Sequence, residues 1–234
     1  MKKLLVLALL TITMVLGAQS IYDIQFTTDA GSDGTYPSTY EGQTVTTSGI
    51  VTAEGYADDA GIKYYLSMPE GGAWKGIFVY DWTTSVAIGD QVEVTGTVVE
   101  YFGFTEITDV TSSEVLSSGN AVPAPVSLST SEIVDGEAYE GVLVKITNVE
   151  VMSSGDYGQY YVSDGSGECQ LDDEFFKPEP TPVDVSVGTT WAQITGIVDY
   201  GYDEYGLNPR TAEDFVLENN NESASWGKVK SMYK

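Results

Sequence analysis

The sequence predicts an all-β protein in which two five-stranded barrels follow one another after a secretory leader. The first observation is a repeat: three sequence blocks recur in the same order about a hundred residues apart. A repeat this long indicates duplicated domains, because solenoid repeats span roughly 20–50 residues. The second observation is that both copies contain short alternating runs rich in β-branched residues, separated by glycine and proline. The third is the lack of any long stretch with helical periodicity.

The first twenty residues have the composition of a signal peptide. Lys2 and Lys3 precede an apolar stretch at residues 4–16, and small residues follow, with cleavage expected after Gly17 or after Ser20. The apolar stretch is short for a membrane span. We therefore expect an exported bacterial protein, secreted, periplasmic or on the cell surface, with no integral membrane segment after signal cleavage.

The first unit is predicted to span residues 21–118. Alternation and glycine punctuation indicate strands at 44–53, 64–66, 76–80, 91–101 and 105–110. Glycines within the longer strands favour a small closed barrel, because glycine lets a strand bend sharply. Residues 112–116 are expected to form a single helical turn.

The second unit is predicted to span residues 119–218. A proline-stiffened linker at 117–125 leads into it, and Ser129 with Glu132 has the spacing of a helix-capping pair. Strands are expected at 142–152, 159–163, 168–171 and 191–200, with a short one near Phe215, and a proline-broken loop at 177–182.

The last segment, residues 219–234, differs from the acidic body before it. It is predicted to be a flexible tail with a basic and aromatic end, containing Trp226 and three lysines. This composition suggests a docking segment for an envelope or sorting partner.

The charge of the chain is strongly negative. It has 35 acidic against 10 basic residues, a formal net charge of −25, and no histidine. The lack of histidine removes the commonest catalytic base and the commonest transition-metal ligand. The only cysteine, Cys169, cannot form an internal disulfide, and acidic neighbours disfavour its thiolate. With no nucleophile motif either, the sequence predicts a protein that is not an enzyme.

Four pieces of the first copy resemble the OB-fold accessory domain of bacterial secreted nucleases. They are SGIVTA at 48–53, GIFVY at 76–80, GDQVEVTGTV at 89–98 and EYFGFTEI at 100–107. The resemblance covers residues 21–116 well and 124–217 more loosely. It implies two tandem OB-type β-barrels that bind nucleic acid, a nuclease-associated module without the catalytic domain.

Aromatic residues gather on the strands and loops that an OB barrel uses for ligands, its strands 2–3 and the loops 1–2 and 4–5. The predicted ligand-binding residues are Tyr65, Trp74, Phe78, Tyr80, Phe102, Phe104, Tyr160, Tyr161, Tyr200, Tyr202, Tyr205 and Arg210. Stacking of a base on such a ring contributes about 1–3 kcal/mol. Sugar rings also stack on tyrosine and tryptophan, and strand alternation requires part of this set to be core.

The ligand itself stays open between nucleic acid and glycan. Single-strand binders need a positive groove to follow phosphates, and this chain offers one only if divalent cations bridge. A neutral glycan avoids that repulsion, and a structural or assembly role in the cell envelope is a third alternative. No catalytic residue, metal ligand or cofactor is predicted; calcium stays an open alternative at the acidic loops 29–34 and 164–174.

Overall fold

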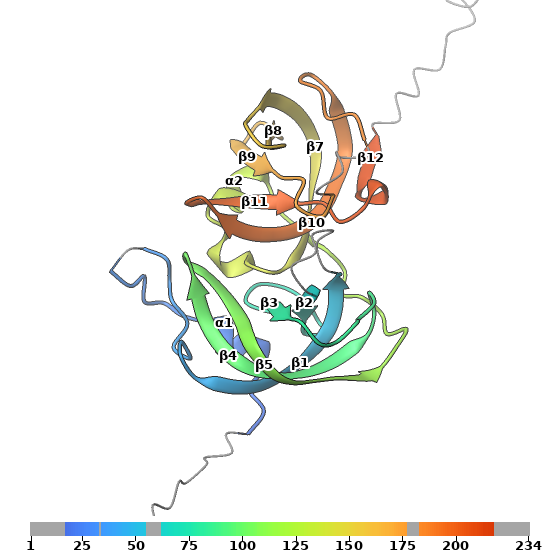
Figure 1. Ribbon diagram of the computed structural model, residues 1–234. Coiled ribbons are helices and arrows are strands. Elements are labelled where there is room, and N and C mark those ends of the chain that lie inside the picture. The colour runs from blue at the N-terminus through green and yellow to red at the C-terminus, as the bar shows by residue number, and fades with distance from the viewer. Residues whose placement is uncertain (1–16, 33, 55–61, 177–182, 218–234) are drawn as a thin grey trace, which may run out of the picture.

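The computed structural model describes residues 17–32, 34–54, 62–176 and 183–217, and it is an all-β structure (Figure 1). The strands form two sheets that lie one above the other, each built from a separate half of the chain. In the described ranges, none of the helices has the length and apolar character needed to cross a membrane. The expectation of an all-β fold is confirmed.

A short helix, α1 (Ile21–Gln25), opens the described fold. The Ser20 side chain accepts a hydrogen bond from the Asp23 amide, and the Asp23 carboxylate accepts one from the Ser20 amide. The Gln19 amide donates to the Thr46 carbonyl of the first strand, 2.8 Å away. These contacts make Gln19 and Ser20 part of the described fold.

The first sheet is a closed five-stranded barrel, which we call the first barrel. Its strands pair in the order β1-β2-β3-β5-β4, with β4 returning to β1. They are β1 (Thr44–Ala53), β2 (Ile62–Ser67), β3 (Gly76–Asp81), β4 (Gln91–Tyr101) and β5 (Phe104–Ser117). All neighbours are antiparallel except β3 and β5, which run parallel. The five strands agree with an OB-like barrel.

The expected helical turn at residues 112–116 is wrong, because β5 continues as a strand through Ser117. After a bulge opposite Thr95, Ser113 pairs with Val94 and Val115 with Val92. The bulge absorbs the interruption in the pattern and lets the same two strands pair over their whole length. The small polar residues in this part of β5 gave no signal of that continued pairing.

The second half of the chain forms a seven-stranded sheet, which we call the second sheet. Its order is β12-β10-β11-β9-β8-β7-β6, with an additional pairing between β10 and β7. The strands are β6 (Val126–Ser127), β7 (Leu143–Ser154), β8 (Tyr160–Ser163), β9 (Glu168–Leu171), β10 (Thr190–Gly201), β11 (Glu204–Asn208) and β12 (Phe215–Leu217). The helices are α2 (Thr130–Val134) and the 3₁₀ turns η1 (Gly136–Tyr139) and η2 (Ala212–Asp214). The expected cap is confirmed: Ser129 is the N-cap of α2 and forms a capping box with Glu132.

The two sheets repeat the same backbone contacts. In the first barrel the Gly42 amide donates to the Val98 carbonyl, 2.9 Å away. In the second sheet the Gly141 amide donates to the Val198 carbonyl, 2.8 Å away. Both glycines have a positive φ, 74° and 70°, which a residue with a Cβ rarely adopts. The Tyr-Glu-Gly blocks of the sequence repeat therefore occupy corresponding positions.

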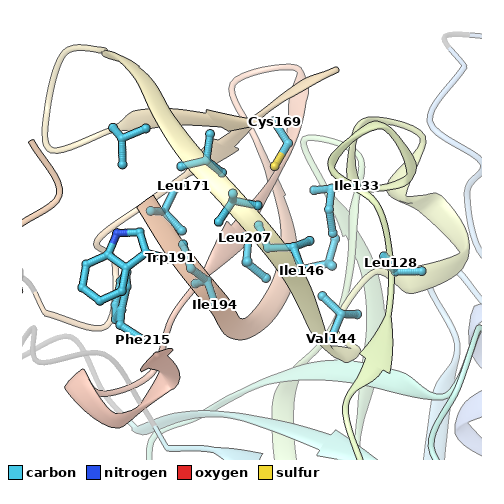
Figure 2. Packing of buried hydrophobic residues seen from close by; sticks show 14 of the residues in the cluster. Leu128, Ile133, Val144, Ile146, Cys169, Leu171, Trp191, Ile194, Leu207 and Phe215 are labelled. Carbon is cyan, nitrogen blue, oxygen red and sulfur yellow. The ribbon is translucent and has the colours of Figure 1, made fainter. Parts of the chain in front are cut away.

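Each sheet encloses its own apolar core. The core of the second sheet gathers branched aliphatic residues around Trp191 and Phe215, whose ring centroids lie 5.1 Å apart (Figure 2). The first barrel encloses a second cluster that includes Tyr64, Ile77 and Ile107, all with no exposed surface. These cores come from the inward-facing residues of the alternating strands.

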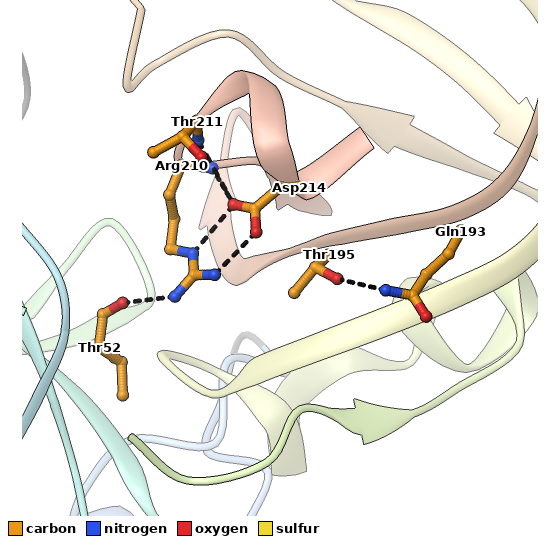
Figure 3. A network of polar contacts seen from close by, with 6 residues as sticks. All are labelled: Thr52, Gln193, Thr195, Arg210, Thr211 and Asp214. Carbon is orange, nitrogen blue, oxygen red and sulfur yellow. Dashed lines mark hydrogen bonds and ion pairs between the residues drawn. The ribbon is translucent and has the colours of Figure 1, made fainter. Parts of the chain in front are cut away.

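A third apolar cluster joins the two halves. It contains Tyr65, Phe78 and Phe104 of the first barrel with Leu143 and Ile197 of the second sheet. Hydrogen bonds also join the two halves at this junction. The Thr105 amide donates to Glu140 Oε1 over 2.9 Å, and Arg210 Nη1 donates to the Thr52 carbonyl over 2.8 Å (Figure 3).

The two halves approach each other closely at a point where backbone atoms of one half contact backbone atoms of the other. Gly76 at the start of β3 lies against Gly141, and a Cβ added to Gly76 would overlap the Gly141 carbonyl. Nearby, the Trp74 amide donates to the Ala138 carbonyl of η1, 2.6 Å away. The halves thus share an apolar cluster, direct hydrogen bonds and a glycine contact, and the candidate site lies beside this junction.

Candidate ligand-binding cleft

A cleft of about 630 Å³ opens between the first barrel and the second sheet, and we call it the junction cleft. Its size is within the range of small-molecule and cofactor sites. The first barrel contributes Lys63, Phe78, Tyr80, Val99, Tyr101, Phe104, Glu106 and Thr108. The second sheet contributes Gln170, Asp172, Glu174, Asp199, Tyr200, Gly201 and Tyr202.

Two β-hairpins bring exposed aromatic rings to the cleft and to a hollow beside it. Tyr101 and Phe102 lie at the β4–β5 turn and are 60% and 83% exposed; Tyr202 lies at the β10–β11 turn and is 93% exposed. Phe102 and Tyr202 both have a left-handed backbone, with φ of 53° and 55°. Tight hairpin turns require such angles, and these turns place large apolar rings where small polar residues are the usual choice. Exposed rings at corresponding turns of both halves are suited to stacking against a planar ligand.

Carboxylates dominate the charge of the cleft. Asp172, Glu174 and Asp199 of the second sheet line it together with Glu106 of the first barrel, and Lys63 is the one basic residue of that lining in the described part of the chain. A site of this kind accepts hydrogen bonds from N–H and O–H groups of a ligand.

Glu106 is buried on β5, with 8% of its surface exposed. Burial raises the pKa of its carboxyl from 4.5 to about 7; the ammonium of Lys63 lowers it, and the neighbouring carboxylate of Glu100 raises it further. The Lys63 Nζ lies 5.4 Å from the centre of the Tyr80 ring, so this cation also lies against an aromatic face. Glu106 therefore changes charge near neutral pH, at the wall of the cleft.

The structure brings five of the sequence-predicted site residues together in the junction cleft. They are Phe78, Tyr80, Phe104, Tyr200 and Tyr202. Tyr200 is the central member, because it lines this cleft and two further hollows beside it. Phe102 borders one of those hollows, and Trp74 and Tyr205 border the other.

The other predicted residues lie outside the cleft lining. Tyr65 is 1% exposed and packs in the cluster that joins the two halves. Tyr160 packs against the core of the second sheet, and the Tyr161 hydroxyl donates to Glu204 Oε1 over 3.0 Å. Strand alternation predicted that part of the aromatic set would be core.

Arg210, another predicted ligand-binding residue, makes structural contacts outside the cleft lining. Its guanidinium donates to both carboxylate oxygens of Asp214, over 3.0 Å and 2.7 Å, and to the Thr52 carbonyl (Figure 3). Asp214 is buried, so the pair is a largely desolvated bidentate bridge. Arg210 fastens the second sheet to the end of β1.

Several cleft residues were not among the predicted ones. Lys63, Glu106 and Asp199 lie on strands, where a single charged residue looks like an ordinary solvent-facing position. The strand register carries the missing signal: Phe78 pairs with Glu106, and Val99 pairs with Glu106 from the other side. A residue that pairs across the sheet with a predicted aromatic residue is therefore a candidate for the same site.

The two acidic loops considered for calcium do not converge on a cation site in the described ranges. No group of three or more aspartate, glutamate or cysteine side chains there has an arrangement that would hold a metal ion. Asp164 instead accepts hydrogen bonds from the amides and hydroxyls of Thr130 and Ser166. These bonds outweigh partial burial and lower its pKa to about 2. The other loop includes Asp33, which lies outside the described residues.

No family model matches the chain. The endonuclease YhcR of Bacillus subtilis (strain 168) is 29% identical over 189 residues, which cover 74% of this chain and 15% of that protein. This chain resembles one part of a bacterial endonuclease. Because it spans only about 15% of the length of YhcR, the likeness concerns that part alone.

Two solved structures are more distant. A structure of the tetrameric p202 HIN2 has a TM-score of 0.35 and 12% identity, covering 73% of this chain and 88% of that one. A structure described as structural mimicry for functional antagonism has a TM-score of 0.35 and 11% identity, covering 72% and 89%. Both TM-scores are too low to support a conclusion about this chain.

Proposed function

We propose that the chain is a non-enzymatic binding module of two tandem OB-type barrels, which binds single-stranded nucleic acid in the junction cleft. The observation that carries the proposal is the convergence of aromatic rings from both halves on one cleft. Tyr80 and Tyr101 come from the first barrel and Tyr200 and Tyr202 from the second sheet. The likeness to part of an endonuclease supports a nucleic-acid ligand.

The carboxylates determine how such a ligand would lie. Glu106 and Asp199 in the wall repel phosphates and accept hydrogen bonds from N–H groups, such as the exocyclic amino groups of cytosine and adenine. Bases would therefore enter the cleft and stack on Tyr101 and Tyr202, while the phosphates stay in solvent. This orientation is the reverse of a groove that follows the backbone with lysine and arginine.

The salt dependence of binding follows from this charge. An ordinary single-strand binder loses affinity as salt rises, because bound counterions are released from the phosphates. Here the net charge of −25 repels the ligand, and salt screens that repulsion. We expect affinity for short single-stranded DNA and RNA to increase between about 50 mM and about 500 mM NaCl, and to increase further with Mg²⁺ or Ca²⁺.

The test is fluorescence anisotropy with labelled oligonucleotides at several salt concentrations. Replacing Tyr101 or Tyr202 with alanine should weaken binding by roughly 5- to 100-fold, the cost of one lost stacking contact. Tyr157→Ala is the matched control, because Tyr157 is 88% exposed but is not part of the cleft lining. Absence of binding at every salt and divalent-ion concentration would contradict the proposal, as would equal losses in the control.

A neutral glycan is the second candidate, and the four carboxylates of the cleft favour it. Sugar hydroxyls donate to carboxylates, and sugar faces stack on the same rings without bringing phosphates near the acidic wall. Glycan binding should be lost in Tyr202→Ala and should not change with salt. The salt response therefore separates the two ligands.

Export, the domain limits and the non-catalytic role belong to the same proposal. The contacts of Gln19 and Ser20 support a mature chain that begins at Ala18, which N-terminal sequencing of the exported protein would test. No nuclease activity on single-stranded or double-stranded DNA is expected with Mg²⁺, Mn²⁺ or Ca²⁺. Activity that a single carboxylate substitution abolishes would refute the non-enzymatic role.

A further inference from the structure

A second hollow, of about 600 Å³, shares Tyr200 with the junction cleft; we call it the aromatic pocket. Four aromatic residues line it: Tyr36, Trp74, Tyr200 and Tyr205. Two carboxylates, Asp135 and Glu137, complete its chemical character, with threonines, Gly34, Val134 and Ala138 between them. Among the residues that the structure describes, none that lines it is a lysine or arginine.

The backbone holds two of these rings in unusual conformations. Tyr36 and Trp74 have φ of 49° and 65°, angles that are rare and strained for residues with large side chains. Trp74 is fixed from two sides: its amide donates to the Ala138 carbonyl over 2.6 Å, and the Phe26 ring packs edge-on against its indole at 5.5 Å. The wall is therefore held in place by the junction between the two halves.

The opposite wall comes from the second sheet. The Tyr200 and Tyr205 rings lie 4.7 Å apart, and the Tyr205 hydroxyl donates to Glu137 Oε2 over 2.6 Å. Glu137 is partly buried, and burial raises the pKa of its carboxyl to about 7. The Tyr205 hydrogen bond lowers this pKa and the Glu100 carboxylate raises it.

We infer that the aromatic pocket binds a small organic cation of the quaternary ammonium class. The faces of tyrosine and tryptophan rings attract cations through their quadrupoles, and groups of such rings are suited to alkylated ammonium ions. Asp135 and Glu137 add negative charge, and no basic side chain opposes it among the described residues of the lining. An anion would meet two carboxylates and the negative faces of the rings.

The aromatic faces of the pocket favour a quaternary cation over a primary amine. An ammonium with N–H groups needs acceptors when it leaves water. Glu137 Oε2 already accepts from Tyr205, and four of the lining side chains are rings. A quaternary nitrogen carries no N–H group and needs only charge and apolar contact. This inference does not depend on the ligand of the junction cleft.

The experiment compares choline with 3,3-dimethylbutan-1-ol, its neutral isostere of the same shape. Titration of the full mature chain at about pH 8 is followed by calorimetry and by tryptophan fluorescence. We expect choline to bind at least roughly tenfold more tightly than the neutral alcohol, because the cation–π and carboxylate contacts act only on the charged ligand. Equal binding of the two would show an apolar pocket, and no choline binding at millimolar concentration would show no site; either result overturns the inference.

Variants locate the binding. Tyr36→Leu should weaken choline binding at least about fivefold. Trp82→Leu is the matched control, because Trp82 is 58% exposed and outside the pocket lining. Tyr202→Ala should leave choline binding unchanged, which distinguishes this site from the junction cleft. Equal effects of Tyr36→Leu and Trp82→Leu would contradict the inference.

The pH response gives a further readout. Choline affinity should rise between about pH 6 and about pH 8 as Glu137 ionises, and Glu137→Gln should remove this rise. Asp135, Glu100, Glu140 and Tyr205 are the other titratable groups near this carboxylate. A thermal melt of Glu137→Gln checks that the variant is folded. An unchanged pH response in a folded Glu137→Gln would contradict the role of this carboxylate.

Discussion

Replacing Glu106 with glutamine should change how the stability of the protein depends on pH. The carboxyl is buried in the wall of the junction cleft, and its pKa rises from 4.5 to about 7 on folding because burial penalises the charged form. The native state therefore binds this proton more tightly than the unfolded chain. The resulting stabilisation is complete below about pH 4.5 and is lost as the pH rises through about 7.

The size of the effect follows from the same two values. A difference of one pKa unit corresponds to about 1.4 kcal/mol. The shift from 4.5 to about 7 would therefore remove at most about 3.5 kcal/mol of unfolding free energy by about pH 8, and about 2 kcal/mol after allowing for solvent at the open side of the cleft. Glutamine keeps the shape of the side chain and does not titrate.

The assay is urea unfolding at about pH 5 and about pH 8, followed by tryptophan fluorescence. The unfolding free energy of Glu106→Gln minus that of the wild type should be larger at about pH 8 than at about pH 5, by about 2–3 kcal/mol. This double difference cancels the intrinsic cost of the substitution, and it separates Glu106 from Glu137, whose pKa is also raised to about 7. Glu93→Gln, at an exposed position on β4, is the control.

A double difference below about 0.5 kcal/mol would refute this reasoning, because the carboxyl would then titrate alike in both states. If Glu93→Gln gave the same double difference as Glu106→Gln, the effect would come from the change in net charge and not from burial.

Three further substitutions or treatments test the junction and the core. Gly76→Ala should lower the thermal midpoint more than an ordinary surface substitution, because the new Cβ meets the backbone of Gly141; an unchanged melt would show that the halves separate freely. Arg210→Lys should destabilise the protein by about 1–3 kcal/mol in urea unfolding, since lysine cannot hold the bidentate bridge and the Thr52 carbonyl together; no loss would make the bridge dispensable. Cys169 should react with a thiol reagent only after unfolding, because it is 1% exposed and burial raises its pKa to about 12; rapid reaction of the native protein would contradict this placement.

The strands were predictable where local pattern and tertiary structure agree. Alternation in β4 and in the first half of β1 gave both strands closely, because successive residues there alternate between buried and more exposed positions. The end of β5 was missed, since Ser112 and Ser113 carry little periodic signal and are held by register with β4. Local propensity does not report long-range pairing of this kind.

The site was predictable only as a set of residue types. Alternation places Tyr65 and Phe78 on shared faces, but it does not say whether a face meets solvent, a ligand or the other half of the chain. The Tyr-Glu-Gly repeat makes the same point: Glu41 is exposed, whereas Glu140 is 2% exposed at the junction. Identical local sequences have different environments because only one of them is covered by the neighbouring sheet.

The glycine contact between the halves also distinguishes equivalent faces of the two sheets. Gly76 pairs with Ser67 in the first barrel, and the corresponding residue, paired with Ser163 in the second sheet, is Glu168. Glu168 is exposed and carries a long charged side chain where Gly76 carries none. The first barrel therefore presents bare backbone to its neighbour at this position, whereas the second sheet presents a charged side chain to solvent. The close backbone approach is thus specific to one face of the first barrel, and the equivalent face of the second sheet is not shaped to make it.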